Sequence, residues 1–279
     1  MPNYSTLERL QMKVLDKATG LMMATTAHRA VYDQFTMTVT GTTDLAPGVR
    51  RITFLADEFA GYTHTGADEY FGLLMPPPGA PLTMPSEDRI NVRQAIRGLP
   101  EDQQPDLRWY TIRRLRRADR EIDVDFVLHG DAGPGSRWAA RAEPGQRVGF
   151  RAGKATYRPT VAGPQLLAAD ETALPALSAI LETHPDADIR AVVEIPDDTF
   201  RLPIDAGHQV TWLVRGDDAP GTRLLPAVAD TDTTGLGYAW LCGESATATG
   251  LRRHLVRDRG VDRRRIMFSG YWKVGAART

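Results

Sequence analysis

The chain has 279 residues and a formal net charge of −1, with 42% hydrophobic and 25% charged residues. This is the composition of an ordinary globular protein; the length favours two domains over one, and the charge gives no support for nucleic-acid binding. No apolar run approaches the roughly 20 residues of a membrane helix, and residues 1–17 lack the apolar core of a signal peptide. The single cysteine, Cys242, rules out an internal disulfide framework. We therefore expect a cytoplasmic protein without a membrane partner.

Residues 1–33 are predicted to form a helical extension of one or two helices. Their apolar residues recur at roughly helical spacing: Leu7, Leu10, Met12, Val14 and Leu15. From Tyr32 onward, short segments alternate apolar and polar residues and are separated by glycine and proline turns. In "EIDVDFVL", for example, Ile122, Val124, Phe126 and Leu128 share one face, and Asp123, Asp125 and Val127 the other. This pattern predicts an antiparallel barrel or sandwich over residues 34–156.

The second half alternates strands and helices, which predicts a parallel-sheet α/β domain over residues 157–279. Strands are expected at "PQLLAAD", "IRAVVEIP", "QVTWLVRG", "GYAWLCGE" and "RRRIMFSGYW", and helices at "ETALPALSAILETH" and "SATATGLRRHLVRDRG". Ser245 is expected to cap the last helix and Gly260 to end it. Ligands of open parallel sheets bind at the C-terminal ends of the strands. Polar, glycine and aromatic residues collect at those ends here, which indicates a binding edge.

The stretch "HGDAGPGSRWAA", which begins at His129, joins three glycines and a proline to a short helix expected to begin at Ser136. Glycines let backbone amides approach a ligand closely, and a helix N-terminus presents unpaired N–H groups. The expected ligand is therefore an anion. As a lone glycine-rich turn the signal is weak, because a tight barrel connection explains it equally well.

The segment "RWYT" is a predicted strand on which Arg108 and Tyr110 point to the same side. The arginine can neutralise a phosphate, the tyrosine ring can lie against a planar cofactor, and Thr111 can add a hydroxyl hydrogen bond. Taken alone, an ordinary barrel strand is the simpler interpretation. With the glycine turn one strand later, the two segments resemble the flavin signature of the ferredoxin-reductase-like superfamily.

Four blocks sharpen this resemblance: "DFVLHGDAGPGSRWA", "DETALPAL", "YAWLCGES" and "GYWKVG". In this order they resemble the siderophore-interacting protein family, which are flavin-dependent ferric-siderophore reductases, over roughly residues 32–275. The resemblance implies an antiparallel FAD-binding β-barrel followed by a parallel-sheet α/β domain that binds NADPH or NADH. Tyr110 and Thr111 would be the catalytic residues.

The resemblance also implies a set of cofactor contacts. The residues that would hold the FAD phosphate and ring are Arg108, Tyr110 and Thr111. The residues that would line its pyrophosphate and ribose side are His129, Gly133 and Ser136. The residues that would face the nicotinamide nucleotide are Asp170, Glu171 and Thr172, and the cofactor set is completed by Asp125, Val127, Gly243 and Glu244. Arg215 would either meet the 2′-phosphate of NADPH or be an exposed loop arginine beside Asp217 and Asp218.

The chain also departs from the family pattern. Gly72 stands where many members carry a lysine of the basic surface that receives the anionic siderophore, and "FRAGKATYRP" replaces a "GPRGS"-like turn. The substrate is therefore less certain than the cofactor, and positive charge near the site would come from Arg137, Arg158 and Lys273. The six histidines show no metal-ligand spacing, so no protein-bound metal is expected.

The sequence thus predicts an oxidoreductase that passes electrons from NAD(P)H through FAD to Fe(III) in a ferric siderophore or another small-molecule acceptor. Two alternatives remain: a flavin reductase or biosynthetic flavoenzyme with a non-siderophore acceptor, and a non-catalytic flavin-binding protein. Cys242 is expected to be a buried core thiol, with a role in placing the nicotinamide as the lesser possibility. Tyr271 and Trp272 are either core aromatics or ring-stacking residues, and the protein is a monomer or a homodimer.

Overall fold

The structure is a computed structural model that describes residues 4–128, 133–204 and 207–275. It consists of two compact units. The first, here called the barrel unit, comprises Met1–Asp16 and Ala27–Ala155, and the second, the α/β unit, comprises Lys17–Thr26 and Thr156–Thr279. Each unit has its own sheet and its own hydrophobic core.

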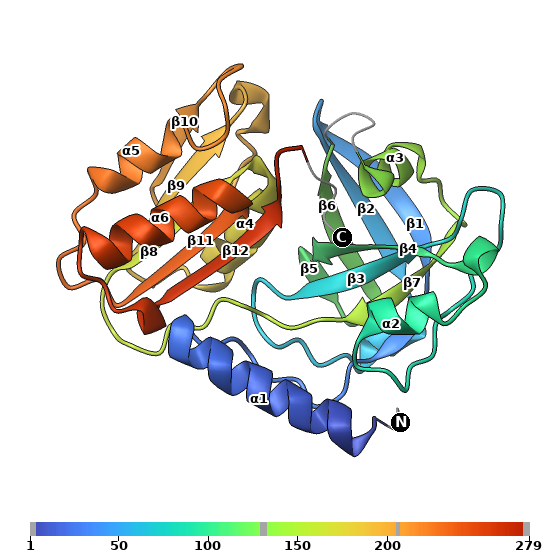
Figure 1. Cartoon of the computed structure of the whole chain (residues 1–279). Coiled ribbons are helices and arrows are strands. Elements are labelled where there is room, and N and C mark those ends of the chain that lie inside the picture. The colour runs from blue at the N-terminus through green and yellow to red at the C-terminus, as the bar shows by residue number, and fades with distance from the viewer. Residues whose placement is uncertain (1–3, 129–132, 205–206, 276–279) are drawn as a thin grey trace. The chain divides into compact units, whose positions relative to one another are not determined.

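The barrel unit is built on one antiparallel sheet, which confirms the predicted class. Its strands follow the order β4-β3-β7-β1-β2-β6-β5 and wrap around a common interior (Figure 1). They are β1 (Gln34–Ala46), β2 (Val49–Leu55), β3 (Tyr70–Met75), β4 (Asp106–Thr111), β5 (Arg114–Arg116), β6 (Glu121–Val127) and β7 (Arg147–Ala152). Two short helices accompany the sheet, α2 (Val92–Arg97) and α3 (Pro134–Arg141), and α3 packs against β2, β4 and β6.

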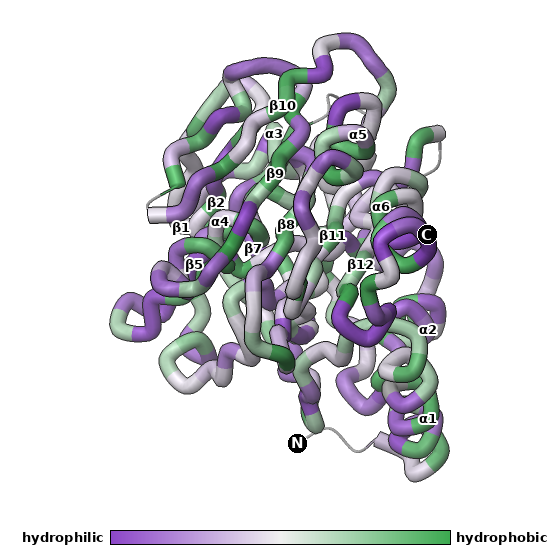
Figure 2. Tube along the Cα trace, turned by 90° about the vertical axis from the view of Figure 1, so that its left-hand side faces the viewer, coloured by the Kyte–Doolittle hydropathy of each residue, from purple (hydrophilic) through white to green (hydrophobic). Residues whose placement is uncertain are grey.

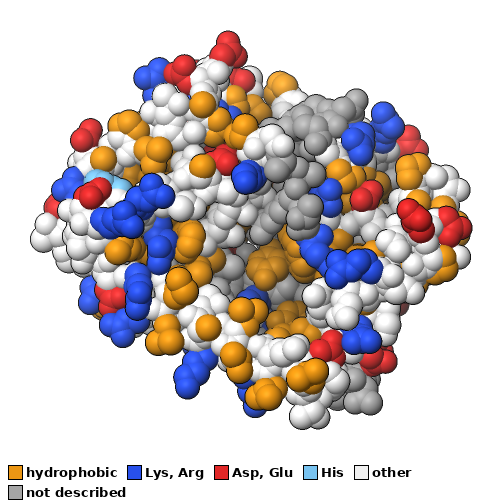
Figure 3. All heavy atoms as spheres, viewed as in Figure 1, with side chains coloured by type: hydrophobic (Ala, Val, Ile, Leu, Met, Phe, Trp, Pro, Cys, Tyr) orange, Lys and Arg blue, Asp and Glu red, His pale blue; other side chains and the backbone are white. Residues whose placement is uncertain are grey.

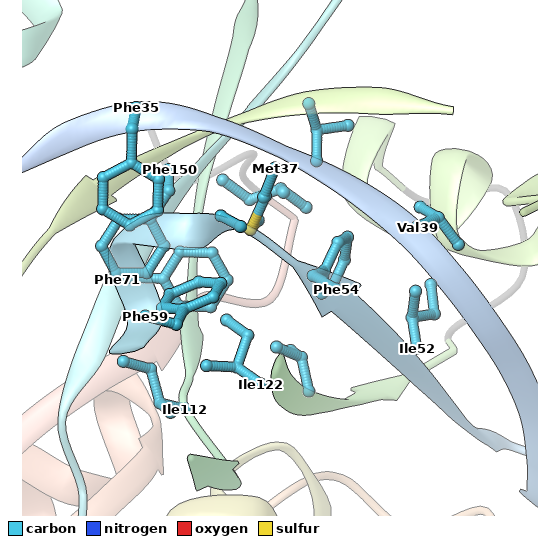
Figure 4. Close-up of a cluster of buried hydrophobic side chains, with 14 of the residues drawn as sticks. Phe35, Met37, Val39, Ile52, Phe54, Phe59, Phe71, Ile112, Ile122 and Phe150 are labelled. Carbon is cyan, nitrogen blue, oxygen red and sulfur yellow. The ribbon is translucent and has the colours of Figure 1, made fainter. Parts of the chain in front are cut away.

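An aromatic stack fills the interior of the barrel unit. Phe35 and Phe71 lie on either side of Phe150, with ring centroids 4.6 and 4.9 Å from it (Figure 4). Ile122, Val124 and Phe126 join this core, as their alternation along the strand predicts. The opposite face of β6 is not solvated, however, because Asp123 and Asp125 are only 4% and 5% exposed. Ion pairs to arginines of neighbouring segments make that burial possible.

The α/β unit holds a five-stranded, all-parallel sheet with the order β10-β9-β8-β11-β12, as predicted. The strands are β8 (Gln165–Asp170), β9 (Ile189–Ile195), β10 (Val210–Val214), β11 (Tyr238–Glu244) and β12 (Ile266–Trp272); the helices are α4 (Leu174–Thr183), α5 (Leu224–Ala229) and α6 (Ser245–Arg257) (Figure 1). From β8 the chain builds β9 and β10 on one side of that strand, and it then crosses over to add β11 and β12 on the other side. The strand order therefore reverses between β8 and β11, and open α/β sheets bind ligands at the C-terminal ends of the strands beside such a reversal.

Several helix ends differ from the sequence prediction. Glu244, not Ser245, caps α6: its carboxylate accepts the amide N–H groups of Ala246 and Thr247. Helix α3 begins two residues before Ser136, because Pro134 has the backbone angle for a first helical residue. Helix α6 ends at Arg257 with Asp258 as its C-cap, earlier than the expected stop at Gly260, whose φ of 69° instead turns the chain after the helix so that the Val261 N–H bonds the Leu255 carbonyl.

The N-terminal extension is a single helix, α1 (Thr6–Met22), and residues 23–33, which the structure describes, contain no second one. Hydrophobic and hydrophilic residues alternate along it (Figure 2). Its apolar side chains are 58–66% exposed: Leu7, Leu10, Val14, Leu15, Leu21 and Met22. Such a contiguous exposed apolar stripe is uncommon on a monomeric protein.

Candidate functional site

At the N-terminus of α3 the first amide groups have no acceptor within the helix. Gly133 is the N-cap residue and supplies no side-chain acceptor, and Pro134 occupies the first helical position. The first bond of the helix runs from the Arg137 N–H to the Gly133 carbonyl. The N–H groups of Gly135 and Ser136 therefore point out of the helix end without an intrahelical partner, and they suit an anion.

Strand β4 lies directly against this helix end. A Cβ atom on Gly135 would lie 2.0 Å from the Tyr110 hydroxyl and 3.3 Å from Cγ of Arg108. Only glycine permits this approach, so the second glycine of "GPGS" brings the two strand residues and the helix N-terminus together. Arg108 is partly exposed, and its Nη1 donates to the Leu107 carbonyl at 2.7 Å. The side chain of Arg108 and the first turn of α3 thus lie close together.

Tyr110 and Thr111 complete the end of β4. The Tyr110 ring packs on Phe126 with a centroid distance of 4.3 Å, and burial raises the pKa of its phenol, so the group stays neutral. Thr111 is 8% exposed and pairs with Tyr70 of β3. Arg108, Tyr110 and Thr111 therefore follow one another along a strand whose position is set by the core.

The predicted residues of β6 occupy other surroundings. Asp125 accepts two hydrogen bonds from Arg51, at 2.7 and 2.8 Å, and lies 3.6 Å from Arg113. It points away from the face on which Phe126 meets Tyr110, so the structure does not bring it to Arg108. Val127 is partly buried opposite Val49. His129 lies outside the described residues, and Ser136 sits in the first turn of α3.

In the α/β unit, the ends of β8, β11 and β12 meet around Asp170. Its carboxylate accepts hydrogen bonds from the Thr172 N–H and hydroxyl, the Glu244 N–H and the Trp272 indole. The side chain is 2% exposed, and its pKa is raised to about 6, first by burial and then by the neighbouring Glu171. Asp170, Thr172, Gly243 and Glu244 thus come together at the strand-order reversal, as the sequence implies.

Arg215 is neither free nor an exposed loop residue. Its guanidinium forms a two-pronged ion pair with Glu171, both contacts at 2.7 Å, and its side chain is 9% exposed. Glu194 lies 3.9 Å from the same guanidinium and accepts the amide N–H groups of Gly221, Arg223 and Leu224, which holds the start of α5. The structure therefore places Arg215 inside an ion cluster at the binding edge.

The three predicted substrate-binding residues are all exposed, and no contact among the described residues brings them together. Arg137 lines a cavity of about 610 Å³ in the barrel unit, together with Trp138, Arg141 and the loop Pro76–Leu82. In the α/β unit, Arg158 donates to the Thr26 carbonyl and Lys273 follows β12. Lysine and arginine side chains also gather over α6 (Figure 3), so positive charge alone does not single out these three.

Three important residues were missed or left undecided by sequence reasoning. Gly135 permits the close contact of α3 with β4, and the sequence feature that could have identified it is the second glycine of the closely spaced pair in "GPGS". Glu194 is fully buried, and the sequence feature that could have identified it is a charged residue inside the apolar run "VVEIP". Trp272 is tied to Asp170, which no spacing reveals. Cys242 is confirmed as a buried thiol.

The described residues contain no group of three or more histidine, cysteine, aspartate or glutamate side chains placed to hold a metal ion. None of the helices in the described ranges combines the length and apolarity that a membrane crossing requires.

The chain matches two family models, one after the other. Residues 38–156 match the siderophore-interacting FAD-binding domain, and residues 162–275 match the siderophore-interacting protein model. Among curated relatives, ferric vibriobactin reductase ViuB of Vibrio cholerae is 26% identical over 81% of this chain and 84% of its own. The NADPH-dependent ferric-chelate reductase of Escherichia coli is 27% identical, over 85% of this chain and 91% of that protein.

Solved structures agree with these matches. A siderophore utilization protein from T. fusca is 32% identical and covers 91% of this chain and 98% of its own, with a TM-score of 0.77. The ferredoxin-NADP+ reductase of Plasmodium falciparum, 9% identical with a TM-score of 0.60 over 86% of this chain and 97% of that one, shows the fold alone. The barrel followed by an α/β domain is thereby confirmed.

Proposed function

Because this chain belongs to the siderophore-interacting protein family, we propose that it is a flavin-dependent reductase that passes electrons from NAD(P)H through FAD to Fe(III) in a ferric siderophore. The observation that carries the proposal is the meeting of the α3 N-terminus with Arg108 and Tyr110 across Gly135. Relatives named as ferric-chelate and ferric vibriobactin reductases support the reaction.

The described residues fit a flavin dinucleotide. The first amides of α3, which have no acceptor within the helix, and the Arg108 guanidinium can neutralise a pyrophosphate, and Gly133 leaves the backbone open to it, since nothing lies within 4 Å of a Cβ there. Tyr110 offers an aromatic ring and Thr111 a hydroxyl at the end of the same strand. His129 and Ser136 would line the pyrophosphate and ribose, and Val127 would complete this set.

FAD, when bound, supplies the redox chemistry, because it takes two electrons as a hydride and releases them singly. The chain's own residues bind the cofactor and orient it. Arg108 and the α3 amides hold the negative charge of the cofactor, and Tyr110 and Thr111 fix its ring. The edge formed by Asp170, Glu171, Thr172, Gly243 and Glu244 would receive NAD(P)H. Exposed Arg137, Arg158 and Lys273 would attract the anionic chelate, and a hard oxygen chelator releases Fe(II) more readily than Fe(III).

FAD titration of the purified protein tests this function. We expect saturable, stoichiometric binding, followed by flavin and tryptophan fluorescence, and an affinity about tenfold or more weaker in Arg108→Ala because a charge-assisted contact is lost. Arg97→Ala is the matched control, since Arg97 is an exposed arginine of the same unit at the end of α2. If the protein does not bind FAD, or if both variants bind equally well, the proposal fails.

One observation favours a different acceptor. A Cβ on Gly72 would lie 2.7 Å from Cδ1 of Leu107 and 3.2 Å from the Trp109 ring, so those side chains fill the space that a lysine would need. A flavin reductase with a non-siderophore acceptor is therefore the second candidate. Steady-state rates with a panel of ferric chelates, quinones and dyes decide between them: faster turnover of quinones or dyes than of every chelate supports the second.

The assembly of the protein is also proposed from α1. We propose a homodimer rather than a monomer, because the exposed apolar stripe of α1 needs a covering surface. The cytoplasmic location is proposed separately, from the single cysteine of the chain. Size-exclusion chromatography with light scattering measures the mass directly. A dimer that dissociates in Val14→Glu supports the assignment, and a monomeric wild-type protein contradicts it.

A further inference from the structure

Asp170 gathers three separate segments of the α/β unit. One carboxylate oxygen accepts the Thr172 N–H at 2.9 Å and the Thr172 hydroxyl at 2.5 Å. The other accepts the Glu244 N–H at 2.7 Å and the Trp272 indole N–H at 2.8 Å. Four donors on two oxygens satisfy a buried carboxylate. With 2% of its surface exposed, Asp170 has little left with which to contact a ligand directly.

The backbone of β11 is shaped to reach this carboxylate. Gly243 has a φ of 141°, and a Cβ there would lie 2.5 Å from Oδ2 of Asp170. Any other residue would be strained by its backbone angle and would collide with the carboxylate. Glycine at this point therefore allows the Glu244 amide to come within hydrogen-bonding distance of Asp170.

Trp272 is held at two points. Its indole N–H donates to Asp170, and its carbonyl accepts the Ser245 hydroxyl at 2.7 Å. The second contact again depends on a glycine, because a Cβ on Gly270 would lie 2.2 Å from the Ser245 hydroxyl. The Trp272 side chain remains partly exposed at the C-terminal edge of the sheet. A flat ring is thus fixed at the place where such sheets bind nucleotides.

We propose that Asp170 is a positioning residue, not a nucleotide ligand: it orients the Trp272 ring and the Glu244 amide as one preformed face for NAD(P)H. This rests on the proposed function, in which the α/β unit receives NAD(P)H. Neighbouring charges make the arrangement sensitive to protons. Glu171 follows Asp170 and is paired with Arg215; Glu194 on β9 and Glu244 on β11 add further buried carboxylates.

Protonation would break this face in a defined way. Burial and the charge of Glu171 raise the pKa of Asp170 to about 6. A carboxyl oxygen that gains a proton becomes a donor, so it can no longer accept both of its present bonds. The Thr172 and Glu244 amides are fixed by the backbone, whereas the Thr172 hydroxyl and the Trp272 indole can turn away. A proton on the oxygen that Glu244 and Trp272 share releases the indole, so we expect binding of NAD(P)H to weaken as the pH falls through about 6.

Two measurements on the full-length protein test the proposal. The Trp272 fluorescence, taken as wild type minus Trp272→Phe, should change with a midpoint near pH 6. The KM for NAD(P)H should rise about tenfold below that midpoint, as loss of one charge-assisted hydrogen bond predicts, while kcat at saturation stays nearly constant. Asp170→Asn has one acceptor oxygen at every pH, so both transitions should vanish and KM should stay high.

A second variant covers the case in which Asp170→Asn does not fold. Trp272→Phe keeps a ring but removes the donor that Asp170 holds, so the KM for NAD(P)H should be high and should show no transition near pH 6. Trp212→Phe, on β10 at the other end of the sheet order, is the matched control and should leave midpoint and KM unchanged. A KM transition that persists in Trp272→Phe or in Asp170→Asn overturns the proposal. FAD binding in these variants reports separately on the proposed function.

Discussion

The two candidate binding regions differ in how far their charged and polar groups are paired within the protein. At the barrel site, the amides at the start of α3 have no acceptor within the helix and Arg108 is partly exposed. At the edge of the α/β unit, Asp170, Glu171, Glu194 and Glu244 are at most 4% exposed, and each carboxylate has partners. The first region keeps its donors for a ligand. In the second region the carboxylates hold the strand ends by accepting backbone amides, and the Trp272 ring remains partly exposed beside them.

Breaking the buried ion pair of the α/β unit should have the largest effect. Arg215→Ala leaves Glu171 as an uncompensated buried charge, and we expect a loss of about 3–5 kcal/mol in the free energy of unfolding. Denaturant unfolding of wild type and variant measures it. Arg223→Ala is the control, because its pair with Asp218 is about half exposed on both sides and should contribute at most about 1 kcal/mol.

The same variant addresses the choice of dinucleotide. If Arg215 also meets the 2′-phosphate of NADPH, the ratio of kcat/KM for NADPH over NADH should fall in Arg215→Ala. An unchanged ratio would leave Arg215 with the structural role that its pair with Glu171 already gives it. A loss of stability no larger than that of Arg223→Ala would contradict the picture of a rigid, charge-held edge.

An intermediate effect is expected at Asp125, where the barrel unit uses a buried charge structurally. Asp125→Ala removes a carboxylate that accepts two hydrogen bonds from Arg51, and we expect a loss of about 1.5–3 kcal/mol of stability. FAD affinity should be unchanged, because Asp125 points away from Tyr110. Both are measured on one preparation by denaturant unfolding and FAD titration. A weaker affinity with normal stability would instead place Asp125 at the cofactor.

The smallest effect on stability should come from Gly135→Ala, which acts on the open site. Alanine normally favours a helix, but here its Cβ would lie 2.0 Å from the Tyr110 hydroxyl, and we expect a cost of about 1–3 kcal/mol with weaker FAD binding. Tyr110→Phe in the same chain removes the nearest clashing atom and should restore part of the stability. Gly61→Ala is the control, since nothing lies within 4 Å of that Cβ and φ is negative. Equal behaviour of the two alanine variants would contradict the close packing of α3 on β4.

Sequence patterns recovered the elements that depend on neighbours along the chain. Alternation in "EIDVDFVL" identified the core face of β6, and the strand–helix rhythm identified the parallel sheet. The same patterns did not reveal that Asp123 and Asp125 are buried, because the arginines that neutralise them sit on other segments. The cap of α6 was misplaced by one residue, since glutamate at that position is a less usual cap than serine.

What the sequence determined by itself is the two-part architecture, the family and the glycine-rich helix start, because periodicity, turn residues and short motifs are local properties. Only the tertiary structure decided which predicted residues meet. It joined Gly135 to Tyr110, drew Arg215 into a pair with Glu171 and placed Trp272 on Asp170, 102 residues away along the chain. The reason is physical: a buried charge or a close backbone approach is defined by groups that only folding brings together.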